Sequence, residues 1–237
     1  MQEFFANLAA DFHQTFIEAD RWLALLKGLG MTLKITAFAL IIGVVLGVLV
    51  AIVRSSHDQM RHPNGVMKLL NKFCHLYLTV IRGTPVMVQL LITYFVVMVN
   101  STNVVLVASI TFGINSGAYV AEIVRGGIMS IDKGQMEAGR SIGMSYAQTM
   151  WYIIAPQVFK NVLPTLCNEF ITLIKETSIA FSLGVSELTN AGDRIRGQTY
   201  SPFMPLIAVA LIYLVIVMIL TKLVSMLERR LRQGDNR

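Results

Sequence analysis

The chain has 237 residues, of which 54% are hydrophobic and only 14% are charged. Soluble domains carry roughly 25% charged residues, so this composition and a mean hydropathy of +0.61 indicate an integral membrane protein rather than a water-soluble globule. The net charge of +6 does not indicate a nucleic-acid-binding surface, because long stretches contain no charge at all, and two cysteines are too few for a secreted disulfide framework.

Residues 1–26 predict an N-terminal segment that lies in the membrane interface. Acidic residues interrupt this segment, and it lacks a basic start followed by an apolar run, so a cleaved signal peptide is not indicated. Bulky apolar residues recur instead at near-helical spacing, which is typical of an interfacial helix. These residues are Phe4, Phe5, Leu8, Phe12 and Phe16.

The stretch from Ile35 to Val53 contains no charged residue and predicts the first membrane-spanning helix. Its 19 residues form a helix of about 28 Å, close to the roughly 30 Å hydrocarbon core of a bilayer. Small residues recur every four positions along one face, which another helix can approach closely. The spacing of Ala39, Gly43, Gly47 and Ala51 does not reveal whether that helix belongs to the same chain or to another subunit.

A second uncharged stretch, Gly83 to Ala121, is too long for one span and predicts two, divided near the polar residues 100–103. A more polar segment around Val158–Leu183 and an apolar one around Phe203–Leu223 bring the prediction to five transmembrane helices. The fold class is therefore an all-α integral membrane protein. We expect a transmembrane domain over residues 27–231 and a short tail over residues 232–237.

Five spans place the two ends of the chain on opposite sides of the membrane. Lysine and arginine residues concentrate after the first, third and fifth predicted spans. Because short loops rich in Lys and Arg remain in the cytoplasm, the sequence predicts a multi-pass protein with its N-terminus outside and its C-terminus in the cytoplasm.

Residues 132–156, between the third and fourth predicted spans, predict two short cytoplasmic helices. Asp132 with Gln135, and Ser145 with Gln148, are spaced as helix caps, and Gly143 lies where the two helices would separate. Apolar and aromatic residues in the second helix need covering, so a docked partner protein explains them better than a solvated loop. They are Met144, Tyr146, Met150, Trp151 and Tyr152.

The fourth predicted span carries three charged residues, Glu169, Lys175 and Glu176. A charge at the centre of a span costs about 2.5–3.5 kcal/mol on insertion scales, so these side chains should face protein or water rather than lipid. Two of them belong to a single helical stripe. The stripe comprises Thr165, Glu169, Thr172 and Glu176, with Asn168 beside it and Lys175 about 100° away.

Two interpretations of these charges remain open: an internal ion pair that fixes helix packing, and a solute pathway. We favour the pathway, since ionisable groups inside spans are functional candidates by default. Carboxylates suit an ammonium or guanidinium group and Lys175 suits a carboxylate, which together suit an amino acid. One helix cannot enclose a pathway, so we expect a second permease subunit, most simply as a symmetric dimer.

The cytoplasmic segment resembles the EAA motif of ABC importer permeases. Glu137-Ala138-Gly139, Gly143, Ile153 and Pro156 follow its spacing, although Gly139 replaces an alanine and Ala155 a leucine. Further stretches resemble the polar amino acid uptake branch of that family, and the resemblance covers about residues 26–231. These stretches are Arg82-Gly83-Thr84-Pro85, the run from Tyr119 to Gly127, and the run from Leu173 to Ser178.

The resemblance implies a type I importer in a bacterial plasma membrane. Its expected partners are a second permease subunit, identical or different, two ATPase subunits that bind ATP and Mg, and an extracellular amino acid-binding protein. This chain would hold no cofactor or metal and would not itself be an enzyme; it contains no phosphate-binding Gly-x-x-x-x-Gly-Lys-Ser/Thr sequence. The substrate-binding residues implied are Glu169, Lys175 and Glu176, with Thr172, Asn168 and Thr165 added from the stripe, and the ATPase-coupling residues are Glu137, Ala138, Gly139, Gly143, Met144, Tyr146 and Trp151.

A stand-alone ion- or proton-coupled amino acid carrier is the main alternative, with the three charged residues as a titrating relay. The sequence shows no inverted repeat to support it. An intramembrane enzyme is a weaker alternative, because no nucleophile or metal motif is present. A cationic or zwitterionic amino acid fits the charges, whereas glutamine, cystine and histidine, and the contacts of Asp193–Arg196, stay open.

Overall fold

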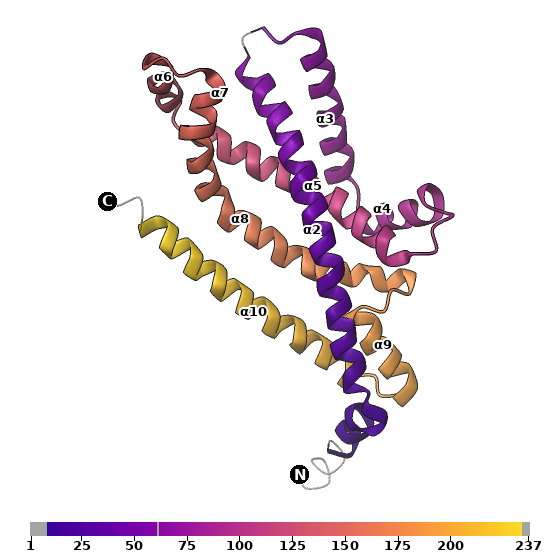
Figure 1. Ribbon diagram of the computed structural model, residues 1–237. Coiled ribbons are helices and arrows are strands. Elements are labelled where there is room, and N and C mark those ends of the chain that lie inside the picture. The colour runs from indigo at the N-terminus through magenta and orange to yellow at the C-terminus, as the bar shows by residue number, and fades with distance from the viewer. Residues whose placement is uncertain (1–8, 61, 234–237) are drawn as a thin grey trace.

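The computed structural model describes residues 9–60 and 62–233, and this part of the chain is helical without a β-strand. Figure 1 shows long helices that diverge from a shared region near the middle of the molecule. The long helices are α2 (Trp22–Gln59), α3 (Gly65–Gly83), α5 (Val104–Met129), α8 (Ala155–Glu176) and α10 (Met204–Gln233). The shorter elements are η1 (His13–Ile17), η2 (Glu18–Asp20), α4 (Val86–Ile92), η3 (Thr93–Val97), α6 (Lys133–Ser141), α7 (Tyr146–Thr149), η4 (Met150–Ile154), η5 (Thr177–Leu183) and α9 (Leu188–Thr199).

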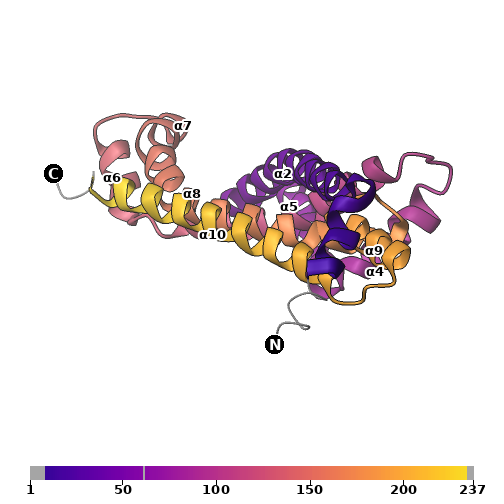
Figure 2. The same cartoon turned by 90° about the horizontal axis from the view of Figure 1, so that it is seen from below.

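The two ends of the molecule carry different elements. α6, α7 and the connection between α2 and α3 lie at one end, which we call the α6/α7 end, and the N-terminal turns and α9 lie at the other (Figure 1). Viewed from below, α10 runs along one side of the molecule next to α8 (Figure 2). Successive long helices therefore run in alternating directions between the two ends.

The N-terminal segment agrees only in part with an interfacial helix. Phe4, Phe5 and Leu8 lie outside the described residues, Phe12 is exposed, and Phe16 is buried. The chain turns at Ala19, which has a positive φ of 54°, and α2 then runs without a break from Trp22.

Close packing between α2 and α5 forms the most extensive helix contact. A Cβ atom added to Gly47 would lie 2.6 Å from the Cβ of Val120, and one added to Gly113 would lie 2.7 Å from the Cβ of Ile42. The small face of the first predicted span is thus confirmed, and its partner is α5 of the same chain. Dense van der Waals contact between such faces is the main source of helix association in a bilayer.

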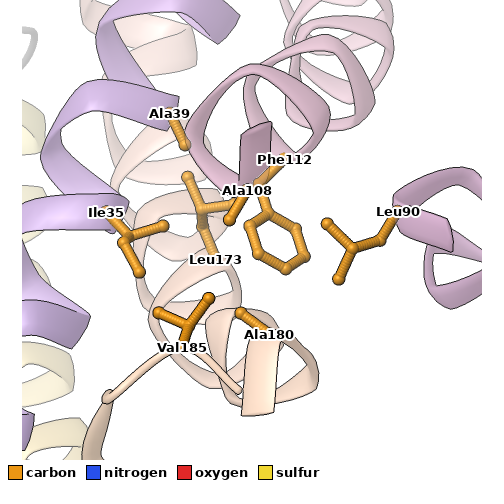
Figure 3. Close-up of a cluster of buried hydrophobic side chains, with 8 residues drawn as sticks. All are labelled: Ile35, Ala39, Leu90, Ala108, Phe112, Leu173, Ala180 and Val185. Carbon is orange, nitrogen blue, oxygen red and sulfur yellow. The ribbon is translucent and has the colours of Figure 1, made fainter. Parts of the chain in front are cut away.

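A buried apolar cluster packs α2 and α5 against α4 and the C-terminal half of α8. Figure 3 shows Phe112 of α5 lying between Leu90 of α4 and Leu173 of α8. Ile35 and Ala39 of α2 complete one side of the cluster. The cluster fixes the C-terminal half of α8 against α2 and α5, which positions the charged residues discussed below.

The predicted second span is wrong in its bounds. The structure has a helix at Gly65–Gly83, and the helix from Val86 to Val97 departs from it at an angle of 108°. Pro85, which has no backbone N–H to donate, begins the new helix after the extended residue Thr84. α3 was not predicted because it carries the basic residues Lys68, Lys72 and Arg82. These follow helical spacing and share one side of the helix with His75 and Thr79.

Three helices among the described residues are long and apolar enough to cross a membrane: α2, α5 and Met204–Leu231 of α10. The bent pair of α3 with Val86–Val97 would be a fourth. In the most apolar window of each helix, 67% is buried within the chain in α5 but only 11% in α10. α10 therefore offers its surface to lipid or to another subunit.

A buried carboxylate connects α9 to α10. Glu187 is fully buried and accepts hydrogen bonds from the backbone N–H groups of Thr189 (2.8 Å) and Asn190 (2.6 Å) and from the hydroxyl of Tyr213 (3.2 Å). Burial raises the pKa of this carboxyl, while the hydrogen bonds act in the opposite direction. Further along α9, Arg196 forms an ion pair with Asp193 at 2.8 Å, one contact of the segment left open by the sequence.

Candidate functional site

α8 carries a row of residues whose character changes along the helix. The row starts at the α6/α7 end with the buried Val158 and Val162 and continues at the same helical spacing through Thr165, Glu169, Thr172 and Glu176. Glu169, Thr172 and Glu176 are half-buried, whereas Thr165 is exposed. The same side of α8 is therefore apolar near α6 and α7 and polar toward the other end.

Glu169 is held by α5. The hydroxyl of Ser116, a fully buried residue, donates a hydrogen bond of 3.0 Å to the Glu169 carboxylate. A carboxylate in this seam between two helices keeps further oxygen lone pairs for a ligand. The contact places the predicted acidic stripe beside α5 and leaves it partly open.

A second polar contact adjoins the first. The amide of Asn115, also buried, donates to the side-chain oxygen of Gln89 at 3.0 Å. The Gln89 amide donates in turn to the carbonyls of Ile81 (2.8 Å) and Thr84 (3.1 Å), at the bend between α3 and α4. Two neighbouring residues of α5 thus contact α8 and the bend between α3 and α4.

Sequence reasoning missed Gln89, Asn115 and Ser116. Asn115 and Ser116 stand next to each other inside an uncharged apolar stretch, and polar side chains buried in a membrane helix need partners. That pair was the available signal. Gln89 had no comparable signal, because its role depends on a bend that the sequence did not predict.

The remaining members of the predicted substrate set are more exposed. Asn168 and Lys175 are exposed on α8, and among the described residues no carboxylate lies within ion-pair distance of Lys175. Thr165 lines a separate cavity of about 380 Å³ together with Lys160 and Ser130. The structure therefore brings Glu169, Thr172 and Glu176 together on one side of α8 but does not join Thr165 or Lys175 to them.

The two short helices predicted within residues 132–156 are confirmed. The Asp132 side chain caps α6 by accepting from the N–H of Gly134, and Ser145 and Gln148 form a reciprocal capping box at α7. Gly143, between the helices, has a φ of +89°, a conformation that glycine adopts without steric cost.

The two short helices are in close contact at Gly139, and most of their other side chains are exposed or half-buried. Gly139 is buried, and a Cβ atom there would lie 2.5 Å from Cγ2 of Thr149, which explains a glycine at this position. Glu137 and Ala138 are exposed and Met144 is half-buried. Trp151 is 73% exposed and Ile142 78% exposed, so this end presents large apolar side chains to its surroundings.

Tyr146 connects the short helices to the bundle. Its hydroxyl donates to the side-chain oxygen of Gln59 at the end of α2, at 2.8 Å, and burial raises the pKa of this tyrosine. Tyr146, Glu137 and Asp58 line a cavity of about 500 Å³ between the short helices and the end of α2. Movement of the short helices would therefore be transmitted to α2.

An apolar helical bundle with a half-buried acidic stripe fits a membrane transport subunit. The chain belongs to the family of binding-protein-dependent transport system inner membrane components, whose family model matches residues 43–233. It is thus a permease subunit of an ABC transporter.

Similar proteins include two curated amino acid permeases. The arginine transport system permease protein ArtQ of Bacillus subtilis (strain 168) is 36% identical over 214 residues, which are 89% of this chain and 94% of ArtQ. The glutamine transport system permease protein GlnP of Escherichia coli (strain K12) is 36% identical over 212 residues, 88% of this chain and 93% of GlnP.

A solved structure with the same fold is the crystal structure of an amino acid ABC transporter with histidines. Its matched chain has a TM-score of 0.80 and 40% sequence identity, and the match covers 91% of this chain and 98% of that one. The helix arrangement therefore belongs to a fold seen in ABC transporters.

Proposed function

We propose that this chain forms the translocation pathway of an ATP-driven importer for a polar amino acid, cationic or zwitterionic. The observation that carries the proposal is the polar half of the α8 row, in which Glu169 is held by Ser116 at 3.0 Å. Glu169 and Glu176 would meet an ammonium or guanidinium group. The curated relatives, named for arginine and glutamine transport, support an amino acid as the solute.

Five membrane crossings fit this architecture: α2, α3, α5, α8 and α10. α8 falls outside the three helices identified by length and apolar character, because charged residues such as Glu169, Lys175 and Glu176 lower its apolar character. One of them, Glu169, faces α5. The alternating direction of the helices and the basic residues near the α6/α7 end support an external N-terminus and a cytoplasmic C-terminus in a bacterial plasma membrane.

The partners follow from the same architecture. The segment from α6 to η4 would dock on a separate ATPase, which binds ATP and Mg, with Glu137, Ala138, Gly143, Met144, Tyr146 and Trp151 at or near the contact and Gly139 holding the two helices together. An extracellular binding protein would deliver the solute. A second permease subunit, identical or different, would close the pathway and cover exposed apolar surface such as that of α10.

The experiment that tests the proposal is ATP-dependent uptake of labelled amino acids into liposomes that hold the chain with its ATPase and binding protein. We expect Glu169→Gln and Glu176→Gln each to lower uptake of a basic amino acid by about tenfold or more, because each removes a charge-assisted hydrogen bond. Asp193→Asn removes an exposed carboxylate on α9 and is the matched control. Unchanged uptake in both α8 variants would exclude the stripe as the solute site.

Membership of the ABC permease family favours this function over a stand-alone carrier. The same liposomes distinguish the two, because a carrier would accumulate solute with an ion gradient and without ATP.

A further inference from the structure

Two sequence stretches that the proposed pathway does not use meet in the structure. Arg82 lies in the last turn of α3, and Glu122 and Tyr119 lie on α5. A guanidinium nitrogen of Arg82 is 3.8 Å from the Glu122 carboxylate, and the guanidinium carbon lies 5.8 Å from the centre of the Tyr119 ring. Residues 37 or more positions apart in the chain therefore form one charged cluster.

The cluster borders a cavity of about 320 Å³ between α2, α3 and α5. Its lining contains two guanidinium groups, from Arg54 and Arg82, and a single carboxylate, from Glu122. His75 and Thr79 lie on the same side of α3 as Arg82. The full lining is Arg54, His75, Leu78, Thr79, Arg82, Gly83 and Glu122, which leaves an excess of positive charge.

The hydrogen-bonding capacity of this cluster is only partly used. Arg54 donates to Asn71 at 3.3 Å, but its buried Nε has no partner. Glu122 lies 3.8 Å from Arg82 and 3.7 Å from Arg125, both longer than a hydrogen bond. Arg125 is engaged elsewhere by Asp58, at 3.1 Å.

A ligand can reach both charges. The Arg82 side chain is 45% exposed and that of Glu122 is 29% exposed. The cavity is lined by Arg54 near the C-terminal end of α2 and by residues 75–83 in the second half of α3. A cationic group alone would be opposed by two arginines, and an anion alone by Glu122.

We propose that this cavity binds a zwitterion, with the oxyanion on Arg82 and Arg54 and the ammonium group on Glu122. A free amino acid carries both groups on one carbon atom, so the cavity would be a second solute site, separate from the α8 stripe. This assignment of the solute rests on the proposed function. A phosphoethanolamine headgroup carries the same two charges, and the test below separates the two sources.

The test is equilibrium binding of labelled L-arginine and L-glutamine to the assembled transporter, without nucleotide or binding protein, in phosphatidylcholine nanodiscs. We expect two classes of site. Arg82→Gln and Glu122→Gln should each weaken one class by about tenfold or more, whereas Glu169→Gln should weaken the other. Arg196→Gln, which removes an exposed ion pair with Asp193, is the matched control.

The lipid source is examined in nanodiscs that contain phosphatidylethanolamine. If the headgroup fills the cavity, amino acid binding of the first class falls there, and native mass spectrometry finds lipid retained by the wild type but lost from Arg82→Gln. That result also supports a zwitterion site. Unchanged amino acid affinity together with unchanged lipid retention in Arg82→Gln and Glu122→Gln would overturn the proposal.

Two further readouts keep the outcomes distinct. If Glu169→Gln weakens a class of site but Arg82→Gln and Glu122→Gln do not, the α8 pathway is supported and the cavity proposal is overturned. If only Arg82→Gln and Glu122→Gln weaken a class, the cavity is supported and the α8 pathway is overturned. If the neutral variants do not assemble, argininamide, which lacks the carboxylate, is tested on the wild type. Equal competition by argininamide and arginine at both classes would also overturn the proposal.

Discussion

α5 packs against two helices in very different ways. Its contact with α2 consists of small and branched apolar residues at near-minimal distance, such as Gly47 against Val120. Its contact with α8 includes the polar pair Ser116 and Glu169 and remains half-open. The first seam leaves no room for a solute at Gly47, and the second has a carboxylate supported by a buried donor.

The difference indicates a division of roles within one subunit. A seam packed at such distances tolerates little relative movement, because any separation loses many contacts at once. A half-buried polar seam loses less on opening, since water or solute replaces the hydrogen bonds of its polar groups. α2 and α5 would therefore move as one body, while α8 would be the side where the proposed pathway opens.

The largest effect is expected in the tight seam, from Gly47→Ala. The added Cβ would meet Val120 at 2.6 Å and the carbonyl oxygen of Gly117 at 2.8 Å, so the two helices must separate. Overpacking of this kind costs about 1–3 kcal/mol. We expect a clear fall in the midpoint temperature of thermal inactivation of the assembled transporter.

Gly30→Ala provides the matched control, because Gly30 lies in the same helix and a Cβ there has no heavy atom within 4 Å. Alanine at an open helical position should leave stability unchanged or raise it slightly. Equal thermal midpoints for the two variants would contradict a rigid α2–α5 seam.

A smaller effect is expected from Ser116→Ala, which removes the donor to Glu169. Water can reach the half-buried carboxylate, so stability should change by less than about 1 kcal/mol. The carboxylate loses its fixed position, and the KM for uptake of a basic amino acid should rise by about threefold to tenfold.

Ser109→Ala controls for the loss of a hydroxyl from α5, because the Ser109 hydroxyl donates only within its own helix, to the Val105 carbonyl at 2.8 Å. A rise in KM for Ser116→Ala but not for Ser109→Ala would support the positioning role. A lower thermal midpoint with an unchanged KM would show that Ser116 serves packing alone.

The sequence was sufficient to predict the tight seam in part. Small residues at four-residue spacing identified the contacting face of α2, because only small side chains permit such close approach. The partner could not be identified, since the same four-residue spacing of Gly113 and Gly117 in α5 indicates a second close-contact face without specifying that it packs on α2.

The capping box of α7 was predicted because it depends on two residues three positions apart, Ser145 and Gln148. At α6 the cap residue Asp132 was predicted, but its side chain accepts from Gly134 and not from Gln135.

The bend between α3 and α4 could not be predicted from the sequence, and the second span was therefore placed wrongly. An average over hydropathy counts Lys68, Lys72 and Arg82 against a membrane helix, although they share one side of α3. The uncharged residues after Gly83 then looked like a full span, whereas only Val86–Val97 is helical there. The acidic stripe was predicted from spacing on one helix, but Ser116 depends on a contact 53 residues away in the chain.

The smallest effect is expected from Thr165→Val, which tests where the polar seam ends. Thr165 shares the row with Glu169, but it is exposed and lines a different cavity with Lys160 and Ser130. Its hydroxyl should contribute little to solute binding, so uptake should change by less than about twofold. Thr172→Val, between the two glutamates, should lower uptake by about threefold, the loss of one neutral hydrogen bond. Equal effects of the two variants would extend the solute site along the whole row, and the division between the apolar and polar parts of α8 would then lie at Val162.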